Sequence, residues 1–227
     1  MKVISAIARY LFIICLPLML ITAVIAGAVN WTGLYTHGFE KYSVEQSLAD
    51  NGVNVTDAEL AGIARSFVQY FNSSEKYITL NIQPDIFNTE EIIHFRDVKS
   101  LFRFDYAVLA GTFGYCLIFG LAGLFLQKGI YRRMLAGVTL KGSAVTLGLM
   151  FLLSIGTLWN FNQIFYDFHL LVFRNQFWSV EGNMLLLFPD GFWYDAAVYC
   201  VVGIGMLAVI LGGLSWFYLN YHRKKQV

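Results

Sequence analysis

The stretch AAVYCVVGIGMLAVILGGLSWFYLNY, residues 196–221, and the HRKKQV that follows it at 222–227 decide the fold class of this chain. The run holds no charged residue, and as a helix it is long enough to cross a hydrocarbon core of about 30 Å. Arg223, Lys224 and Lys225 follow it directly, and short basic flanks of this kind stay on the cytoplasmic side of a membrane. The stretch therefore predicts a transmembrane helix that ends in the cytoplasm.

Three further uncharged runs have the same character, at residues 10–29, 106–127 and 142–165. The whole chain of 227 residues is 57% hydrophobic and only 14% charged, which is far from the composition of a soluble domain. The first run resembles a signal peptide at Ala26-Gly27-Ala28, but its length favours an uncleaved anchor. The sequence therefore predicts an all-α integral membrane protein, a single membrane domain over residues 1–227 with four transmembrane helices.

The charges fix the expected orientation of these spans. All fifteen acidic residues lie between Glu40 and Asp195. The segments that flank the spans on the other side carry basic residues and no acid: Lys2, Arg9, Lys128, Arg132, Arg133, Lys141, Arg223, Lys224 and Lys225. Because such residues are retained in the cytoplasm, we expect both termini and the loop at about 128–141 to be cytoplasmic. An extracytoplasmic cap at about 30–103 and an extracytoplasmic loop at about 166–195 remain outside.

The net charge and the positions of the cysteines argue against nucleic-acid binding and disulfide chemistry. The formal net charge of +1 hides a basic inner face that suits anionic lipids, and it argues against nucleic acid as a partner. Cys15, Cys116 and Cys200 each lie within a different apolar run, where a thiol usually packs as a small apolar group. No disulfide chemistry is expected.

The cap is too short to bury a large core alone, so we expect it to pack on the spans or the membrane. Thr56 and Glu59 have the spacing of a capping box. The apolar residues after them recur as on one face of a helix: Leu60, Ile63, Ala64, Phe67 and Phe71. Residues 77–82 alternate as in a short strand that ends before Pro84. The cap is therefore predicted to be mostly helical.

A second helix of the cap is predicted to begin at Asn88 or Thr89 and to carry the first candidate site. His94 and Asp97 lie three residues apart on it, so imidazole and carboxylate share a face and can form a hydrogen bond. The apolar residues among its charges favour a helix that lies in the membrane interface. An isolated histidine could equally be a packing residue here.

The outer loop at 166–195 is rich in aromatic residues, which favour the lipid headgroup level. His169 follows the third span by a few residues, so we expect it at that depth. Asn162, Arg174 and Trp178 are candidate contacts to the polar part of a substrate for the same reason.

Common catalytic motifs are missing from the sequence: there is no Gly-x-Ser-x-Gly elbow, phosphate-binding glycine loop or His-Glu-x-x-His helix. Two histidines with a nearby acid remain, and these residues suit proton transfer near neutral pH. Two alternatives stay open. His94, Asp97 and His169 could bind zinc or iron in a metal-dependent hydrolase, or the chain could be a non-catalytic membrane subunit or sensor.

The block HFRDVK at residues 94–99, the pair Phe168-His169 with an aromatic run to Trp178, and Phe188-Pro189 before the last span resemble the bacterial lipoprotein intramolecular transacylase family. The four-span layout with a large first outer segment is similar as well. The resemblance implies an intramolecular acyltransferase without a cofactor, in the bacterial plasma membrane. Its substrate would be a diacylglyceryl lipoprotein in the outer leaflet.

The implied reaction moves the sn-2 acyl chain from glycerol to the α-amino group of the N-terminal cysteine, which gives a lyso-form lipoprotein. His169 would act as the base and His94, oriented by Asp97, would stabilise the oxyanion, without a covalent acyl-enzyme. The roles of the two histidines could also be exchanged.

Overall fold

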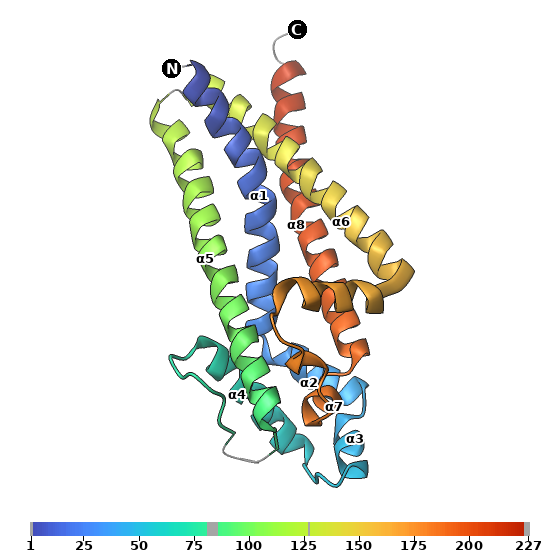
Figure 1. Cartoon of the computed structure of the whole chain (residues 1–227). Coiled ribbons are helices and arrows are strands. Elements are labelled where there is room, and N and C mark those ends of the chain that lie inside the picture. Colours follow the sequence, from blue (N-terminus) through green and yellow to red (C-terminus); the bar gives the residue numbers. More distant parts are fainter. Residues whose placement is uncertain (1, 81–85, 127, 225–227) are drawn as a thin grey trace. The chain divides into compact units, whose positions relative to one another are not determined.

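The computed structural model is built of helices (Figure 1) and describes residues 2–80, 86–126 and 128–224. The helices within these ranges are α1 (Lys2–Asn30), α2 (Thr32–Lys41), α3 (Val44–Asp50), α4 (Asp57–Asn72), α5 (Thr89–Leu126), α6 (Lys128–Val172), the short 3-10 helix η1 (Phe177–Ser179), α7 (Asn183–Leu187) and α8 (Asp190–Lys224). The described part of the chain holds no strand. The strand prediction is therefore wrong for residues 77–80, while Ile82 and Pro84 lie outside the described residues.

Four of the described helices, α1, α5, α6 and α8, are long and apolar enough to cross a membrane. The prediction of an all-α membrane protein with four transmembrane helices is confirmed. Two local expectations are wrong. Residues 128–141, predicted as a loop, belong to α6, and α5 is one continuous helix from Thr89 to Leu126, with no separate interfacial helix around His94. Its 38 residues extend about 57 Å at 1.5 Å per residue, which is longer than a hydrocarbon core.

Helix α6 is broken at Asn160, which has the non-helical backbone angles φ −160° and ψ 81°. The side-chain oxygen of Asn160 accepts a hydrogen bond from the backbone N–H of Gln163 at 3.2 Å. This is the contact that an asparagine makes at the start of a helix. The sequence predicts one span to about residue 165 with a loop after it, but residues 161–172 form a second helical segment with its own N-terminus.

By its contacts the chain divides into two compact units, and the first comprises Met1–Ile25, Asp105–Ile155 and Tyr199–Val227. Its core contains Phe12, Leu16, Leu20, Val138, Met150, Ile204 and Ala208. A Cβ atom built on Gly142 would lie 2.8 Å from Leu16 Cδ2, so α6 approaches α1 too closely there for a larger residue. Such close packing through small residues is typical of membrane helices.

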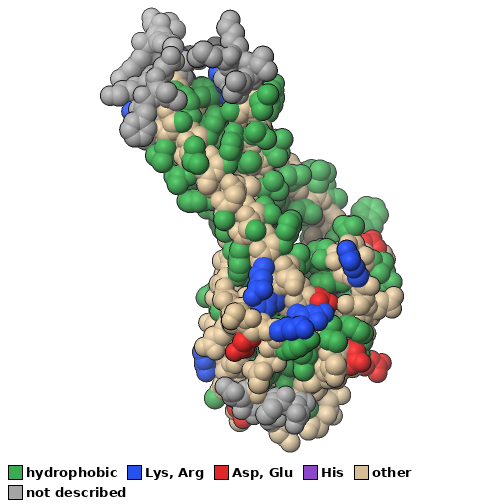
Figure 2. All heavy atoms as spheres, turned by 60° about the vertical axis from the view of Figure 1, so that its left-hand side comes forward, with side chains coloured by type: hydrophobic (Ala, Val, Ile, Leu, Met, Phe, Trp, Pro, Cys, Tyr) green, Lys and Arg blue, Asp and Glu red, His purple; other side chains and the backbone are tan. Residues whose placement is uncertain are grey.

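The outer surface of this first unit is apolar. Large side chains such as Ile118, Phe151 and Phe217 are more than half exposed. On the face shown in Figure 2, hydrophobic side chains cover the first unit, whereas most of the charged side chains that are coloured gather over the second. A surface of this kind is stable in lipid and not in water.

The second unit comprises Ala26–Phe104 and Gly156–Val198. Its core combines α2, α3, α4, the start of α5 and residues before and after the start of α8, with Phe67 in contact with the rings of Phe95 and Phe188. The predicted capping box of α4 is present, because Thr56 N donates to Glu59 Oε2 at 2.8 Å and Glu59 N donates to Thr56 Oγ1 at 3.3 Å. All five residues of the predicted apolar face of α4 are buried. The cap is thus mostly helical, with a core of its own.

Candidate active site

The first turn of α5 is anchored by a buried carboxylate. Glu91 is 1% exposed, and its side chain accepts hydrogen bonds from Asn88 N at 2.8 Å and from Met184 N at 2.6 Å. Asn88 Oδ1 in turn accepts from Glu91 N at 2.9 Å, which completes a reciprocal cap. A Cβ built on Gly182 would lie 2.1 Å from Glu91 Oε1, so only glycine leaves room for this contact. The anchor fixes the helix one turn before His94.

His94 lies in the part of α5 that belongs to the second unit, before the uncharged run that begins at Tyr106. Its side chain is 6% exposed, and its ring packs edge-on against Phe173 with the centroids 4.9 Å apart. The Nδ1 atom is buried and has no hydrogen-bond partner in the described part of the chain. Burial, followed by the neighbouring imidazole of His169, lowers the pKa of His94 to about 4, against a smaller opposing effect of Asp97. The ring is therefore neutral at pH 7.

His169 lies on the segment of α6 that follows the break at Asn160. Its Nδ1 atom is 2.7 Å from the carbonyl oxygen of Phe165, one turn earlier. A carbonyl oxygen only accepts, so Nδ1 carries the proton and Nε2 of the neutral ring keeps its lone pair. Burial lowers the pKa of His169 as well, and the hydrogen bond to Phe165 opposes this effect. His169 is thus held as a neutral base with Nε2 unoccupied by that contact.

The two histidines, 75 positions apart in the sequence (94 and 169), lie side by side in the second unit. Their ring centroids are 6.2 Å apart, with 34° between the ring planes. Aromatic rings surround His169, with centroids at 4.3 Å for Phe165, 4.7 Å for Trp178 and 5.4 Å for Phe173. Such a shell keeps water from the imidazoles and strengthens their interactions with a bound group.

Trp178 adds a second unpaired polar atom beside the histidines. Its Nε1 is buried and has no hydrogen-bond partner within the described residues, and its ring also contacts Tyr166 at 5.4 Å. A buried donor without a partner costs about 1–3 kcal/mol. Two such atoms, on rings that both lie beside His169, are what a site has when its ligand supplies the missing acceptor or donor.

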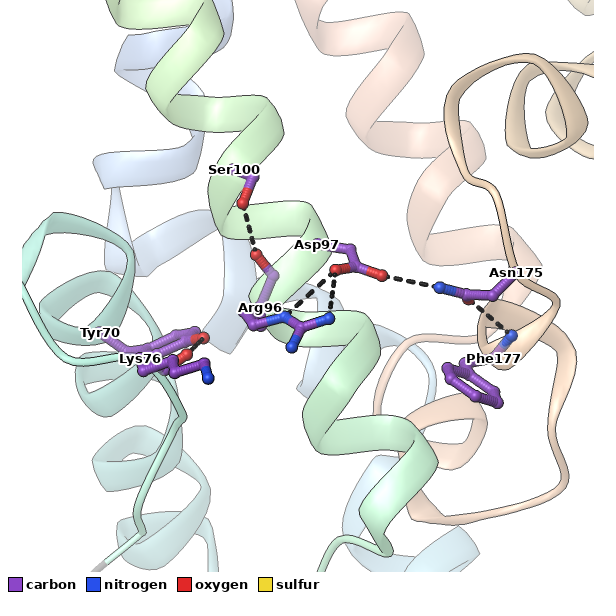
Figure 3. A network of polar contacts seen from close by, with 7 residues as sticks. All are labelled: Tyr70, Lys76, Arg96, Asp97, Ser100, Asn175 and Phe177. Atoms are coloured by element: carbon purple, nitrogen blue, oxygen red, sulfur yellow. Dashed lines mark hydrogen bonds and ion pairs between the residues drawn. The ribbon is translucent and has the colours of Figure 1, made fainter.

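Asp97 does not make the hydrogen bond to His94 that the helical spacing allows. Its Oδ1 accepts from the guanidinium of Arg96 at 3.1 and 3.3 Å, and its Oδ2 accepts from Asn175 Nδ2 at 2.9 Å (Figure 3). Both oxygens are therefore directed to other partners. A shared helix face brought the two side chains near each other, but Asn175, 78 positions away in the chain, competes successfully for the carboxylate.

Lys99, the last residue of the HFRDVK block, is also directed inward. It is 3% exposed, and its Nζ donates to Ser73 Oγ at 2.9 Å and to the carbonyl oxygen of Glu75 at 2.8 Å. Its ammonium also lies 4.0 Å from the ring centroid of Tyr70. The block thus fastens the segment after α4 to α5, a structural role for Lys99 that the sequence did not indicate.

The structure shows no contact between the histidines and two of the predicted substrate-binding residues among those it describes. Asn162 and Arg174 are exposed, and neither makes a hydrogen bond or ion pair with His94 or His169 among the contacts of the described residues. Their predicted role in substrate binding stays a prediction.

The arrangement of His94, Asp97 and His169 does not favour the alternative of a metal-dependent hydrolase. In the described ranges, no group of three or more His, Cys, Asp or Glu side chains is arranged to hold a metal ion. Asp97 is the expected third ligand beside the two histidines, but its two carboxylate oxygens accept hydrogen bonds from Arg96 and Asn175. The described residues around the two histidines do not form the ligand set that a hydrolytic zinc or iron site requires.

Comparisons with known proteins agree with this arrangement. Residues 10–193 match the family profile described as lipoprotein intramolecular transacylase Lit. The chain belongs to the lipoprotein intramolecular transacylase family. It is therefore a membrane-embedded enzyme, an acyltransferase whose partners are lipoproteins and the bilayer. Among curated proteins none matches the chain significantly.

Solved structures of a Lit protein share the fold. The in meso structure of the membrane integral lipoprotein intramolecular transacylase Lit from Bacillus cereus aligns with a TM-score of 0.81 at 18% identity, over 99% of this chain and 100% of that one. Two variants of the Bacillus cereus protein also align at 18% identity. One has a histidine replaced by arginine (TM-score 0.77, 99% and 96% covered) and the other has a histidine replaced by alanine (0.78, 98% and 97%). This likeness establishes that the transacylase fold extends over nearly the whole chain.

Proposed function

We propose that this transacylase moves the sn-2 acyl chain of a diacylglyceryl lipoprotein to the α-amino group of the N-terminal cysteine, with His94 and His169 as its acid–base pair. The observation that carries the proposal is the pairing of the two rings at 6.2 Å, both buried and both held neutral. A structural role alone does not call for two adjacent buried imidazoles, one of which has an unpaired nitrogen.

The substrate amine sets the first requirement. An α-amino group has a pKa of about 7.7–8.0 and is largely protonated at neutral pH, so a base must take a proton before the nitrogen can attack. His169 fits this role, because its Nδ1–H is held by the carbonyl of Phe165 and its Nε2 lone pair is free of that bond. The amine nitrogen then bonds to the sn-2 carbonyl carbon, and the carbonyl oxygen takes up negative charge.

The second requirement is collapse of this tetrahedral intermediate. The bond from the acyl carbon to the glycerol oxygen breaks, and the amide forms as the nitrogen gives up a second proton, which the glycerol oxygen receives. The first proton, taken from the ammonium by His169, passes on to water. His94, neutral at pH 7, supplies the N–H of its ring as a neighbouring hydrogen-bond donor, and the unpaired Nε1–H of Trp178 is a further donor for the oxyanion. The same shift with the two histidines exchanged uses the same atoms.

Tethering explains why no activated donor is needed. Amine and ester belong to one modified cysteine, and attack closes a ring of about eight atoms, so the reaction gains from effective molarity once the lipid is held in place. An ester is exchanged for a more stable amide. Arg174 and Asn162, both exposed in the second unit, are proposed contacts for the polar head of the substrate.

We place the site at the outer leaflet of the bacterial plasma membrane, with both termini in the cytoplasm. The distribution of basic residues supports this orientation. The first turn of α1, the last turns of α5 and α8 and the first turn of α6 lie at the same end of the first unit (Figure 1), as the proposed topology requires.

The test is mass spectrometry of a model diacylglyceryl lipopeptide after incubation with purified protein. Wild-type protein should give the lyso product, with the acyl group on the amine, and His169→Ala and His94→Ala should lower the rate by at least about 100-fold. His37→Ala is the matched control, because His37 is an exposed histidine of the same unit. Transfer at the wild-type rate in both active-site variants would refute the proposal.

A further inference from the structure

The amide side chain of Asn175 joins the segment between α6 and η1 to α5. Asn175 Nδ2 donates to Asp97 Oδ2 at 2.9 Å, and Asn175 Oδ1 accepts from the backbone N–H of Phe177 at 3.1 Å (Figure 3). The side chain of Asn175 therefore links the carboxylate of Asp97 on α5 to the backbone of its own segment at Phe177.

This segment, residues 173–178, supplies two of the rings that enclose the histidines. Phe173 contacts His94 at 4.9 Å and His169 at 5.4 Å, and Trp178 contacts His169 at 4.7 Å. The other hydrogen bonds seen for the segment are local. Phe173 N donates to the carbonyl of His169, and Ser179 donates through its N–H and its hydroxyl to the carbonyl of Gln176. Asn175 lies between the two rings in the sequence, and its bridge joins the backbone next to Trp178 to Asp97 of α5.

The carboxylate at the other end of the bridge is itself fixed. Arg96 donates to Asp97 Oδ1 from both Nε and Nη2, and the Arg96 guanidinium lies over the ring of Tyr77 at 5.9 Å. Asp97 is 24% exposed at its side chain, so the pair is partly shielded from water. Charge-assisted hydrogen bonds in such a setting are stronger than neutral ones.

From this chain of contacts we propose that Asn175 is a positioning residue, which Asp97 holds so that Phe173 and Trp178 stay against His94 and His169. Asp97 then serves the acyl transfer through the aromatic segment and not through a hydrogen bond to His94. This inference rests on the proposed function for the identity of the reaction. It assigns to Asn175 a role that the sequence did not indicate.

The geometry allows the two partners to be exchanged. In Asn175→Asp two carboxylates face each other, and the resulting repulsion pushes the segment from α5. If Asp97→Asn is added, the amide at position 97 can donate to the carboxylate at position 175 and still accept from Arg96. The new carboxylate keeps an oxygen for the N–H of Phe177. The exchanged pair therefore satisfies the same groups.

The experiment compares wild type, Asn175→Asp, Asp97→Asn and the double variant, as full-length protein in lipid. Rates are measured at saturating and limiting lipopeptide, and thermal unfolding is followed in parallel. Asn175→Asp should lower kcat by about 10- to 100-fold, because a shift of the order of 1 Å has this cost for a positioned group, and KM should change less than threefold. The double variant should return to within about threefold of wild type.

Asn72→Asp is the matched control. Asn72 also joins two elements of the second unit by its amide, which donates to Asn30 Oδ1 at 2.6 Å and to the carbonyl oxygen of Val68 at 2.7 Å, and neither contact involves the histidines or residues 173–178. It introduces the same charge and should leave kcat unchanged. A second readout follows the loop directly, by subtracting the emission spectrum of the Trp178→Phe form of each protein. The Trp178 emission should shift in Asn175→Asp and return in the double variant.

The outcomes separate the two proposals. A double variant that stays as slow as Asn175→Asp while it unfolds at the wild-type temperature overturns the positioning role, and so does Asn175→Asp with wild-type kcat and emission. If wild-type protein itself gives no lyso product, the proposed function fails. The Trp178 emission of the four proteins then still decides whether the Asp97–Asn175 pair holds the segment.

Discussion

Replacement of Trp178 by phenylalanine should separate catalysis from stability in a way that few substitutions do. The indole Nε1–H is buried without a partner in the described residues, so the folded protein without substrate bears a desolvation cost of about 1–3 kcal/mol for it. Phenylalanine removes this donor and relieves that cost. It also removes part of the ring that packs on His169 and Tyr166, a loss of about 1–2 kcal/mol. We expect the free energy of unfolding to change by less than about 1 kcal/mol.

Activity should respond differently, because the same N–H is a donor for the oxyanion of the transition state. A hydrogen bond to a charged group contributes about 1.5–3 kcal/mol, which corresponds to a loss of about 10- to 150-fold in kcat. The assay is the rate of lyso-lipopeptide formation by mass spectrometry, at saturating substrate, beside thermal unfolding in the same detergent.

Trp193→Phe is the control for this prediction. Trp193 packs on Phe165 and Phe188 in the same unit, and its replacement costs packing without removing a buried unpaired donor. It should lower stability with little effect on kcat. Trp178→Phe protein that unfolds several degrees lower but turns over at the wild-type rate would show that the indole only fills space.

Two further predictions concern the scaffold around the histidines. Glu91→Gln should lower the free energy of unfolding by about 3 kcal/mol, because one of two charge-assisted hydrogen bonds to backbone N–H groups is lost in a buried site. Thermal unfolding measures this change, with Glu90→Gln as the neighbouring control. Equal melting temperatures for the two variants would contradict the prediction. Stability should also fall on acidification, because the pKa of His94 in the folded protein, about 4, lies below its value of about 6.5 in the unfolded chain. The free energy of unfolding is therefore unaffected by His94 above pH 6.5 and falls as the pH drops toward 4. The loss is about 2 kcal/mol at pH 5. Melting curves between pH 5 and pH 8 test the sign, and His94→Gln should flatten the dependence; an equally steep dependence in His94→Gln would contradict the assignment.

Much of this architecture can be predicted from the sequence because its signals are local. Uncharged runs give the four spans, and the spacing of Thr56, Glu59 and the apolar residues after them gives α4 with its cap. The two histidines stood out because histidine is the side chain whose ordinary pKa lies near neutral pH. The reading of Asn88 or Thr89 as a helix start is confirmed by α5.

The parts that escaped prediction depend on contacts between distant residues. Nothing near Asp97 in the sequence reveals that Asn175 will compete for its carboxylate, and nothing near Glu91 reveals the backbone N–H of Met184. The Asn88-x-x-Glu91 spacing did carry a capping signal that could have been used. Asparagine favours caps and turns over helix interiors, but Asn160 lies inside a long uncharged run, and the break in α6 was hidden because that run was interpreted as one continuous span.

Because α6 is broken at Asn160, the helical segment that bears His169 starts there. The direction of the imidazole therefore depends on the number of residues between Asn160 and His169. Successive residues of a helix turn by about 100°, so one residue added or removed between positions 160 and 169 would swing the ring to another side of the segment. Spacing, and not only chemistry, is therefore under constraint in this stretch. Side chains on its outward side can vary freely in size, while its length cannot.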